Sequence, residues 1–206
     1  SIAEMCFARV PLVLLNMGRG QGDYYQATRG GGHGDYRTIV LAPADLAEAV
    51  PLIQRAFHLA DRFRNPVLFM GDYYLAHVVE AVDTSAVAFD PLPAKDWALN
   101  GATSGTGKAR IVSPIMPKKR TDADFIEYGD YLETSGDKIA EIVDGLDPMY
   151  EAGFCEDADY VVVAYGTPAR IIRYVVGDLR RQGLKVGFFR PITLFPYPSD
   201  ALAQAC

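Results

Sequence analysis

Hydrophobic runs and one amphipathic stripe predict a parallel β-sheet in the first third of the chain. Two apolar runs, Val10–Asn16 and Thr38–Ala42, have the composition of buried strands, and Val67–Met70 is a third. Between the second and third runs, Asp45–Arg64 places apolar residues at helical spacing. A strand, a helix and a strand joined by a short return predict a βαβ unit with parallel strands and a right-handed crossover.

Two prolines bear on that helix. Pro51 removes a backbone donor and crowds the carbonyl of Ala47, so we expect a kink or a late helix start there. The residue before a proline avoids the helical region, so Asn65-Pro66 is expected to end the helix.

A second βαβ unit is predicted near the end of the chain. Tyr160–Tyr165 is expected to be a fully buried strand and Lys185–Arg190 the next strand. Between them, Thr167 is the expected N-cap of a helix and Pro168 fits its first turn. Gly183 is expected to stop that helix.

The middle of the chain differs from both units because prolines and a polar Gly/Thr/Ser patch interrupt it. It has the character of a long surface connection. Within it, Asp122–Asp147 carries apolar residues at helical spacing, although Gly129 and Gly136 weaken that prediction.

The predicted organisation therefore has three parts. Residues 1–79 form the end of one α/β domain, residues 80–158 a connecting segment with a possible helix, and residues 159–206 the start of a second α/β domain. Ser1–Arg9 resembles the tail of a helix and Ser199–Cys206 opens another, so we expect a partial chain.

Composition and charge narrow the class of protein. The chain has 206 residues, half of them hydrophobic, and a net charge of −6, which argues against a nucleic-acid or anionic-membrane surface. No apolar run approaches the roughly 20 residues that a membrane span needs, and no signal peptide is recognisable. Three cysteines lie far apart and form no metal-ligand or cluster spacing, which is typical of a cytoplasmic protein.

The segment between the first two strands carries the candidate chemistry. Open parallel sheets bind ligands at the carboxyl ends of their strands, and Arg19 follows the first strand between Gly18 and Gly20. A guanidinium is a planar fork of donors that binds a carboxylate bidentately, and small neighbours let a ligand approach the backbone. The alternative is a solvated loop arginine.

Three further polar residues are candidates. His33 lies in a glycine-rich stretch and titrates in the range that suits proton transfer, but a lone histidine is more often structural. Asp35 and Asp72 could orient a ligand, and helix capping is their default role. Tyr24, Tyr25, Tyr73 and Tyr74 are expected to be packing or interface residues.

The stretch Ala102–Ala109 superficially matches a phosphate-binding P-loop. The pattern needs Gly where Ala102 stands, Ser or Thr where Ala109 stands, and a preceding strand. It is therefore predicted to be a flexible loop, which could reach an active site. No protease, hydrolase, dinucleotide-binding or metal-ligand signature is present in the sequence, so no metal site is assigned to this chain.

Four segments together resemble the α subunit of 2-oxoacid:ferredoxin oxidoreductases, in particular the branched-chain type that acts on 3-methyl-2-oxobutanoate (2-ketoisovalerate). They are PLVLLNMGRG, QGDYYQATRGGGHGDYRTIVLAP, LADRFRNPVLFMGDYYL and VVVAYGTPARIIRYVVGDLRRQGLKVGFFRPITLFPYP. The resemblance covers most of the chain and is looser over residues 89–157. It implies part of a parallel-sheet domain that binds the pyrimidine of thiamine diphosphate, followed by part of an α/β domain like the C-terminal domain of transketolase.

The same resemblance implies the activity and its cofactors. The family oxidatively decarboxylates a 2-oxoacid to acyl-CoA and CO₂ and reduces ferredoxin, with thiamine diphosphate, Mg²⁺ and coenzyme A. A β subunit supplies the diphosphate half-site, and [4Fe–4S] clusters lie in partner subunits, which include a γ and a ferredoxin-like δ subunit. The absence here of the family's diphosphate-and-metal signature, since Gly71-Asp72-Tyr73 does not satisfy it, agrees with a shared site.

In this family Arg19 corresponds to the arginine taken to hold the 2-oxoacid carboxylate, with Gly20 and Gln21 beside it in the substrate site. Asp35 and Asp72 are then cofactor-proximal candidates, and His33 a catalytic candidate. The family's usual Gly-Pro-Ser-Thr-Gly continuation is missing, because Gln21-Gly22-Asp23 follows directly.

Two other functions remain open from the sequence. The chain could be a non-catalytic docking or dimerisation module whose loops recognise a partner. It could also belong to another thiamine diphosphate enzyme, of transketolase or dehydrogenase type. Pyruvate, 2-oxoglutarate and aryl 2-oxoacids are alternative substrates.

Overall fold

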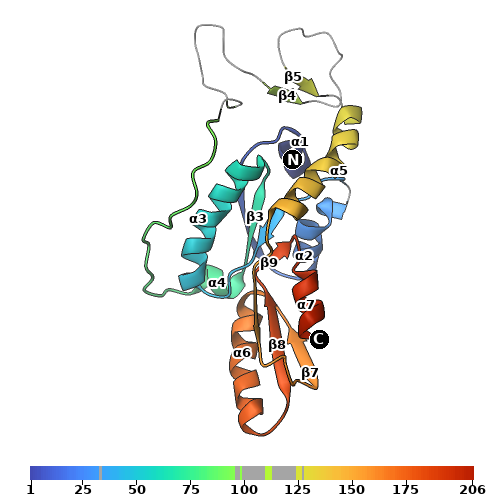
Figure 1. The fold of residues 1–206 in the computed structure, drawn as a ribbon. Coiled ribbons are helices and arrows are strands. Elements are labelled where there is room, and N and C mark those ends of the chain that lie inside the picture. The colour runs from blue at the N-terminus through green and yellow to red at the C-terminus, as the bar shows by residue number, and fades with distance from the viewer. Residues whose placement is uncertain (33, 96–97, 99–109, 113–123, 127) are drawn as a thin grey trace.

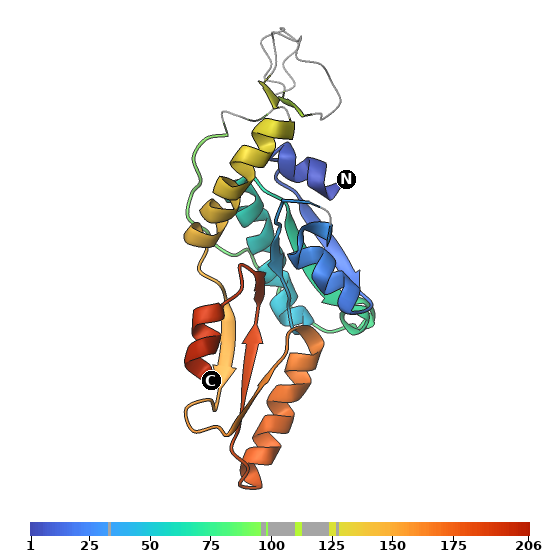
Figure 2. The same cartoon turned by 90° about the vertical axis from the view of Figure 1, so that its right-hand side faces the viewer.

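The computed structural model describes the chain except for residues 33, 96–97, 99–109, 113–123 and 127. Two α/β units lie end to end, the first built from residues near the N-terminus and the second from residues near the C-terminus (Figures 1 and 2). Each unit contains a βαβ crossover with parallel strands, as the hydrophobic pattern predicted.

The first sheet has the strand order β1-β3-β2-β9. Strands β1 (Val13–Gly18), β3 (Val67–Asp72) and β2 (Ile39–Leu41) run parallel, and β9 (Thr193–Phe195) joins antiparallel to β2. Gly18 is in register with Asp72, so the carboxyl ends of β1 and β3 lie side by side.

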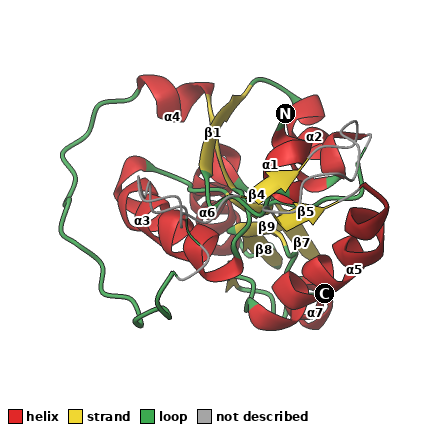
Figure 3. Ribbon diagram, turned by 90° about the horizontal axis from the view of Figure 1, so that it is seen from above, coloured by secondary structure: helices red, strands yellow, loops and turns green. Residues whose placement is uncertain are grey.

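Helices cover both faces of this sheet, because strand side chains alternate between the two faces. On one face, α3 (Leu46–Phe63) and α5 (Tyr128–Gly145) pack on alternate residues of β2 and β3. On the other face, α2 (Gln21–Thr28) contributes Ala27 to a second cluster. Seen from above, α3 lies on the left and α2 and α5 on the right, with β1 at the upper edge (Figure 3).

Helix α3 has a side-chain cap at its N-terminus. Asp45 accepts a hydrogen bond from the Glu48 amide at 2.9 Å, and Arg64 ends the helix in the left-handed conformation. The expectation of a late start at Pro51 is wrong, because Asp45 satisfies a free amide of the first turn and Pro51 lies inside the continuous helix. The predicted end before Asn65-Pro66 is confirmed.

The segment after β1 is not the loop that its composition suggested. It folds into α2 and a short 3₁₀ turn at Gly30–Gly32. Its apolar residues are too few and too scattered to show helical spacing, and Gly20 and Gly22 flank the helix start. A short helix at the N-terminus, α1 (Ile2–Phe7), packs against Tyr36.

The connection between the units is partly irregular. After α4 (Tyr73–His77), residues 78–95 form no helix or strand, and Gln54 of α3 bonds to the backbone of Ser85 and Val87. Strands β4 (Arg110–Val112) and β5 (Asp124–Ile126) pair in parallel. Helix α5 therefore begins six residues later than Asp122, because residues 124–126 are a strand.

The second sheet has the order β6-β8-β7. Its strands are β6 (Tyr150–Gly153), β8 (Val186–Pro191) and β7 (Tyr160–Val163), crossed by α6 (Gly166–Arg181), and the chain continues into α7 (Ser199–Ala205). Gly183 follows α6 with φ +86°, which confirms its role as the helix stop. Over the described residues, no helix combines the length and the apolar character needed to cross a membrane.

Two predictions for this unit are wrong. Strand β7 is an edge strand rather than a buried one, and 75% of the Tyr160 side chain is exposed. Thr167 is not the N-cap, because α6 already begins at Gly166 with Tyr165 in the cap position. The Thr167 hydroxyl is instead buried within the first turn, and it has no hydrogen-bond partner among the residues that the structure describes.

Leu59 tests the core of the first unit. Its side chain is 2% exposed between α3 and the sheet. Leu59→Ala removes apolar contact and leaves a cavity, so we expect the free energy of unfolding to fall by about 2–5 kcal/mol. Urea denaturation measures the loss, and a value below about 1 kcal/mol would show that this interface is loosely packed.

Candidate functional site

A cavity of about 670 Å³ opens where the two units meet. Its walls come from the carboxyl ends of three strands, β1, β3 and β7, and from the first turns of α4 and α6. Such edges of parallel sheets are the usual ligand sites of open α/β folds. The lining residues are Gly18, Arg19, Gly20, Met70, Gly71, Asp72, Tyr73, Tyr74, Val163, Ala164, Tyr165, Gly166 and Pro168.

Asp23 holds the backbone that carries Arg19. One carboxylate oxygen of Asp23 accepts hydrogen bonds from the Arg19 amide at 2.9 Å and from the Gly20 amide at 3.2 Å. The bond from the Arg19 amide is the main reason that the pKa of Asp23 lies below its ordinary value. Sequence reasoning missed Asp23, although an acidic residue three positions after Gly20 is a signal for a helix start.

Asp72, at the carboxyl end of the neighbouring strand β3, has a structural role. Its Oδ1 accepts a hydrogen bond from the Leu75 amide at 2.9 Å, which confirms the capping interpretation. Its Oδ2 faces the second unit, since a Cβ atom added at Gly166 would lie 3.7 Å from it. Gly166 has φ +65°, a conformation that side chains rarely adopt, so glycine suits this contact between the units.

Two tyrosines connect the units beside the cavity. The rings of Tyr24 on α2 and Tyr165 before α6 stack with centroids 5.6 Å apart. Burial, followed by the nearby Tyr24, Asp23 and Asp72, raises the pKa of Tyr165. The stack confirms Tyr24 as a packing residue and makes Tyr165 a wall shared by this cavity and a neighbouring one of about 230 Å³.

The charge of the cavity is sparse. Among the lining residues that the structure describes, Arg19 is the one cationic side chain and Asp72 the one acidic side chain. Asp72 already caps α4, and the other lining residues are glycine, aliphatic or aromatic. This arrangement suits a ligand with one anionic group and an apolar body.

The structure brings together some of the predicted site residues and separates others. Arg19, Gly20 and Asp72 line the large cavity, whereas Gln21 lines the neighbouring one. Asp35 is exposed and precedes the amino end of β2, so it is not brought to the carboxyl edge where Arg19 lies. His33 and the segment Ala102–Ala109 lie outside the described residues.

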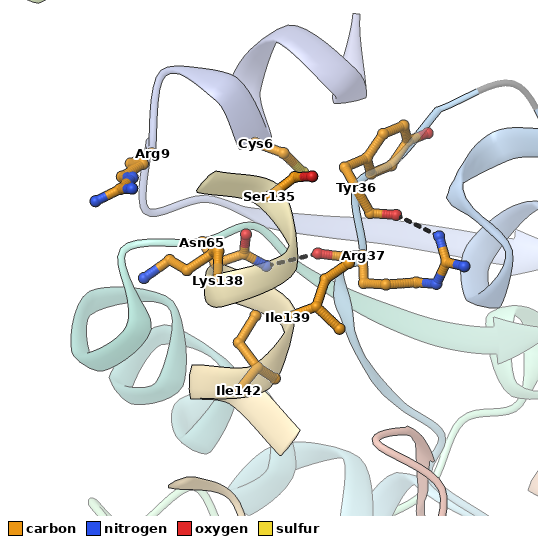
Figure 4. Close-up of a pocket in the computed structure, with 9 residues that line it drawn as sticks. All are labelled: Cys6, Arg9, Tyr36, Arg37, Asn65, Ser135, Lys138, Ile139 and Ile142. Atoms are coloured by element: carbon orange, nitrogen blue, oxygen red, sulfur yellow. Dashed lines mark hydrogen bonds between the residues drawn. The ribbon is translucent and has the colours of Figure 1, made fainter. Parts of the chain in front are cut away.

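A third, much smaller cavity of about 20 Å³ lies between α1, α5 and the chain before β2 (Figure 4). The Asn65 amide donates to the Arg37 carbonyl at 3.0 Å, and the Arg37 guanidinium donates to the Tyr36 carbonyl at 2.8 Å. Cys6 is buried at its wall, and burial raises the pKa of its thiol to about 12. The volume of this small cavity suits a water molecule rather than a substrate.

Metal-ligating side chains are not clustered in the part of the chain that the structure describes. No group of three or more His, Cys, Asp or Glu side chains there could hold a metal ion.

Family comparisons agree with this geometry. Residues 6–151 match the family model described as pyruvate flavodoxin/ferredoxin oxidoreductase, thiamine diphosphate-binding, and residues 158–206 match pyruvate:ferredoxin oxidoreductase core domain II. The fold is an α/β fold with a parallel sheet, and the matching family model over residues 6–151 is one of thiamine diphosphate-binding domains. The chain belongs to the 2-oxoacid:ferredoxin oxidoreductase family.

Individual relatives refine the comparison. The chain is 38% identical to ketoisovalerate oxidoreductase subunit VorB of Methanothermobacter thermautotrophicus, over 93% of this chain and 52% of the relative. It is 30% identical to 2-oxoglutarate synthase subunit KorA of Methanocaldococcus jannaschii, over 89% of this chain and 54% of the relative. The chain thus spans about half the length of these relatives.

A solved structure supports the fold. The 2-oxoglutarate:ferredoxin oxidoreductase from Magnetococcus marinus, with 2-oxoglutarate, coenzyme A and succinyl-CoA bound, superposes with a TM-score of 0.69 at 21% identity. The match covers 100% of this chain and 41% of the other.

Asp23→Ala should release the Arg19 segment. The two amides lose their acceptor, so hydrogen exchange at Arg19 and Gly20 should accelerate while exchange in the β3 strand stays unchanged. The pKa of Asp23 is lowered from 3.8 in the folded chain, so its stabilisation is complete above pH 3.8 and disappears as pH falls through the lower folded pKa. Unchanged exchange in the variant at pH 7 would remove Asp23 from this role.

Cys6 should resist alkylation. A thiol with a pKa of about 12 stays protonated at pH 8, whereas Cys206 is exposed. Iodoacetamide followed by peptide mass analysis should find Cys206 modified in the native protein and Cys6 modified only after unfolding. Equal labelling rates at the two positions would contradict the buried placement of Cys6.

Proposed function

We propose that this chain is the α-type subunit of a thiamine diphosphate-dependent 2-oxoacid:ferredoxin oxidoreductase that acts on a branched-chain 2-oxoacid. The reaction converts the 2-oxoacid and coenzyme A into acyl-CoA and CO₂ and transfers two electrons to ferredoxin. The observation that carries the proposal is the position of Arg19 in a largely apolar cavity at the carboxyl ends of β1 and β3.

Arg19 is the proposed carboxylate ligand, with Gly20 and Gln21 beside it. A guanidinium presents two parallel donors to a carboxylate, which fixes both the position and the plane of the acid group. Gly20 leaves open space beside the clamp, because a Cβ atom added there would meet no atom within 4 Å. The segment can therefore accept a substrate carboxylate close to the backbone.

The apolar walls of the cavity are the proposed site of the substrate's side chain. Met70, Val163 and Ala164 are apolar, and the described lining of the cavity contains no cation besides Arg19. A 2-oxoacid with a second carboxylate would leave that charge without a partner, which costs binding energy. This lining and the similarity to the VorB relatives both support an aliphatic, branched-chain 2-oxoacid.

The cavity also fits one part of thiamine diphosphate. Tyr73, Tyr74 and Pro168 offer apolar surface that suits the flat aminopyrimidine ring, and Asp72, which lines the same cavity, is the proposed cofactor-proximal acid. When bound, the cofactor supplies a carbon nucleophile for the keto group and a sink for the electrons left by CO₂. This chain's residues hold the acid, orient the keto group and exclude water from it.

The remaining chemistry is assigned to partners. In this proposal a β subunit supplies the diphosphate and Mg²⁺ half-site, and γ and ferredoxin-like δ subunits complete the assembly. The [4Fe–4S] clusters lie in these partners, and coenzyme A enters as a substrate. The three free cysteines of this chain agree with a reducing cytoplasmic setting.

The proposed domains divide the work. Residues 1–79 carry the pyrimidine-binding domain and Arg19, and residues 159–206 begin the transketolase C-terminal-like domain that closes the cavity with Gly166. Residues 80–158 connect the two and add α5 to the first unit and β6 to the second sheet. His33 remains a predicted proton-transfer residue, whereas Asp35, predicted to be cofactor-proximal, does not line the cavity in which the cofactor is proposed to bind.

Arg19→Ala in the assembled enzyme tests the proposal. Loss of a charge-assisted pair with the substrate should lower kcat/KM for 3-methyl-2-oxobutanoate by about 10- to 150-fold. Arg19→Lys keeps the positive charge but not the two parallel donors. Its kcat/KM should therefore lie between that of the unchanged enzyme and that of Arg19→Ala. Ferredoxin reduction measured spectroscopically gives the rates.

Two outcomes would point elsewhere. Unchanged kcat/KM with lost subunit assembly would favour a docking module. Turnover of the 2-oxoacid without ferredoxin reduction would favour another thiamine diphosphate enzyme, of transketolase or dehydrogenase type.

A further inference from the structure

An ion pair between a buried arginine and a partly buried glutamate connects the two units. Arg190, at the end of β8, is 5% exposed and donates two hydrogen bonds to Glu48 of α3, at 2.7 and 2.6 Å. Its Nε also lies 3.1 Å from Glu151 on β6, which pairs in turn with Arg173 of α6. Two guanidinium groups and two carboxylates thus balance in charge across the junction.

Glu48 transmits this contact to the cavity wall. The Glu48 oxygen that accepts one of the Arg190 bonds also accepts the Ala44 amide at 2.7 Å. The preceding residue, Pro43, places its carbonyl oxygen 3.9 Å from the position that a Cβ atom of Gly166 would occupy. Gly166 lines the cavity together with Asp72, whose Oδ2 lies 3.7 Å from the same Cβ position. Ala44, which bonds to Glu48, therefore directly follows Pro43, which lies against Gly166. These two adjacent residues link the ion pair to the contact between the units at the cavity.

The position of Glu48 in its helix suits an acidic side chain. It lies in the first turn of α3, where the helix dipole stabilises a carboxylate. Its bonds to Arg190 are bidentate, so they fix orientation as well as distance. A buried ion pair adds little net stability compared with apolar residues of the same shape. Its value here is geometric, because it joins α3 of the first unit to β8 of the second.

We propose that Glu48 and Arg190 form a positioning pair that sets the width of the cavity between the Arg19 wall and the Gly166 wall. The two residues do not line the cavity and act through Ala44 and Pro43. The consequence for substrates rests on the proposed function: the pair adjusts the pocket to the size of the side chain of the 2-oxoacid. Without it, the second unit shifts against β3 and small and branched acids are distinguished less well.

Arg190→Lys and Glu48→Gln in the assembled enzyme test the proposal. Both retain a polar partner but lose the bidentate pair. The ratio of kcat/KM for 3-methyl-2-oxobutanoate to that for 2-oxobutanoate should fall by about 3- to 10-fold, part of the discrimination that one carbon group allows. Leu59→Ala, which weakens the same helix away from the junction, is the matched control and should leave the ratio unchanged.

Hydrogen exchange provides a readout that needs no turnover. Amides of residues 166–170 and 72–75 should exchange faster in both variants, and the core strand residues 67–70 should not. A double variant, Glu48→Leu with Arg190→Met, restores a neutral, filled junction without the fork. It should recover assembly while still showing the reduced substrate ratio and the faster exchange.

The outcomes separate this inference from the proposed function. Unchanged substrate ratio and unchanged exchange at residues 166–170 would overturn the positioning role, even if Arg19→Ala abolishes activity. An assembled enzyme that oxidises no 2-oxoacid would overturn the proposed function, and exchange alone would then decide the positioning role. If the single variants do not assemble, the double variant gives the same decision.

Discussion

Strand β9 leaves the second unit and pairs with β2 of the first, and the position of the cavity depends on this pairing. Leu41 pairs with Thr193, and the Ala42 amide donates to the Ile192 carbonyl at 2.8 Å. Because β8 runs directly into β9, the second sheet cannot move without disturbing the first. The carboxyl end of β7 and the start of α6 are thereby held against the carboxyl ends of β1 and β3. The ion pair of Arg190 with Glu48 lies beside this crossing and adds a second attachment of defined orientation.

The candidate site illustrates how few polar groups a ligand pocket needs. One cation, Arg19, is mounted on a backbone turn that Asp23 holds with two hydrogen bonds, and its neighbours are small or apolar. The surrounding helices position the strand ends, and the cationic group, Arg19, comes from the segment directly after β1. This division suits a subunit whose cofactors perform the bond breaking, since the protein then contributes orientation and exclusion of water.

The sequence predicted the parts of the fold that depend on local patterns. The strands at Thr38–Ala42 and Val67–Met70 and the helix at Asp45–Arg64 follow from hydrophobic periodicity, and the family resemblance singled out Arg19. The misses concern contacts between distant segments. Helix α6 begins at Gly166 rather than at Thr167. The positive φ of Gly166 and its approach to Asp72 and Pro43 are properties of the assembled junction, so a local pattern does not predict them. The contribution of Tyr165 to the cavity is of the same kind. Helix α2 was missed for the opposite reason, since its own residues lack an amphipathic pattern.

The walls of the cavity contain residues near positions 19, 72 and 166, which are separated by most of the chain length. Such a pocket does not exist in any partly folded intermediate that lacks one of the three segments. A molecule that occupies it binds only the completed structure, so mass action draws the folding equilibrium toward that state as its concentration rises. The level of such a molecule in the cell would then influence how long this chain survives proteolysis.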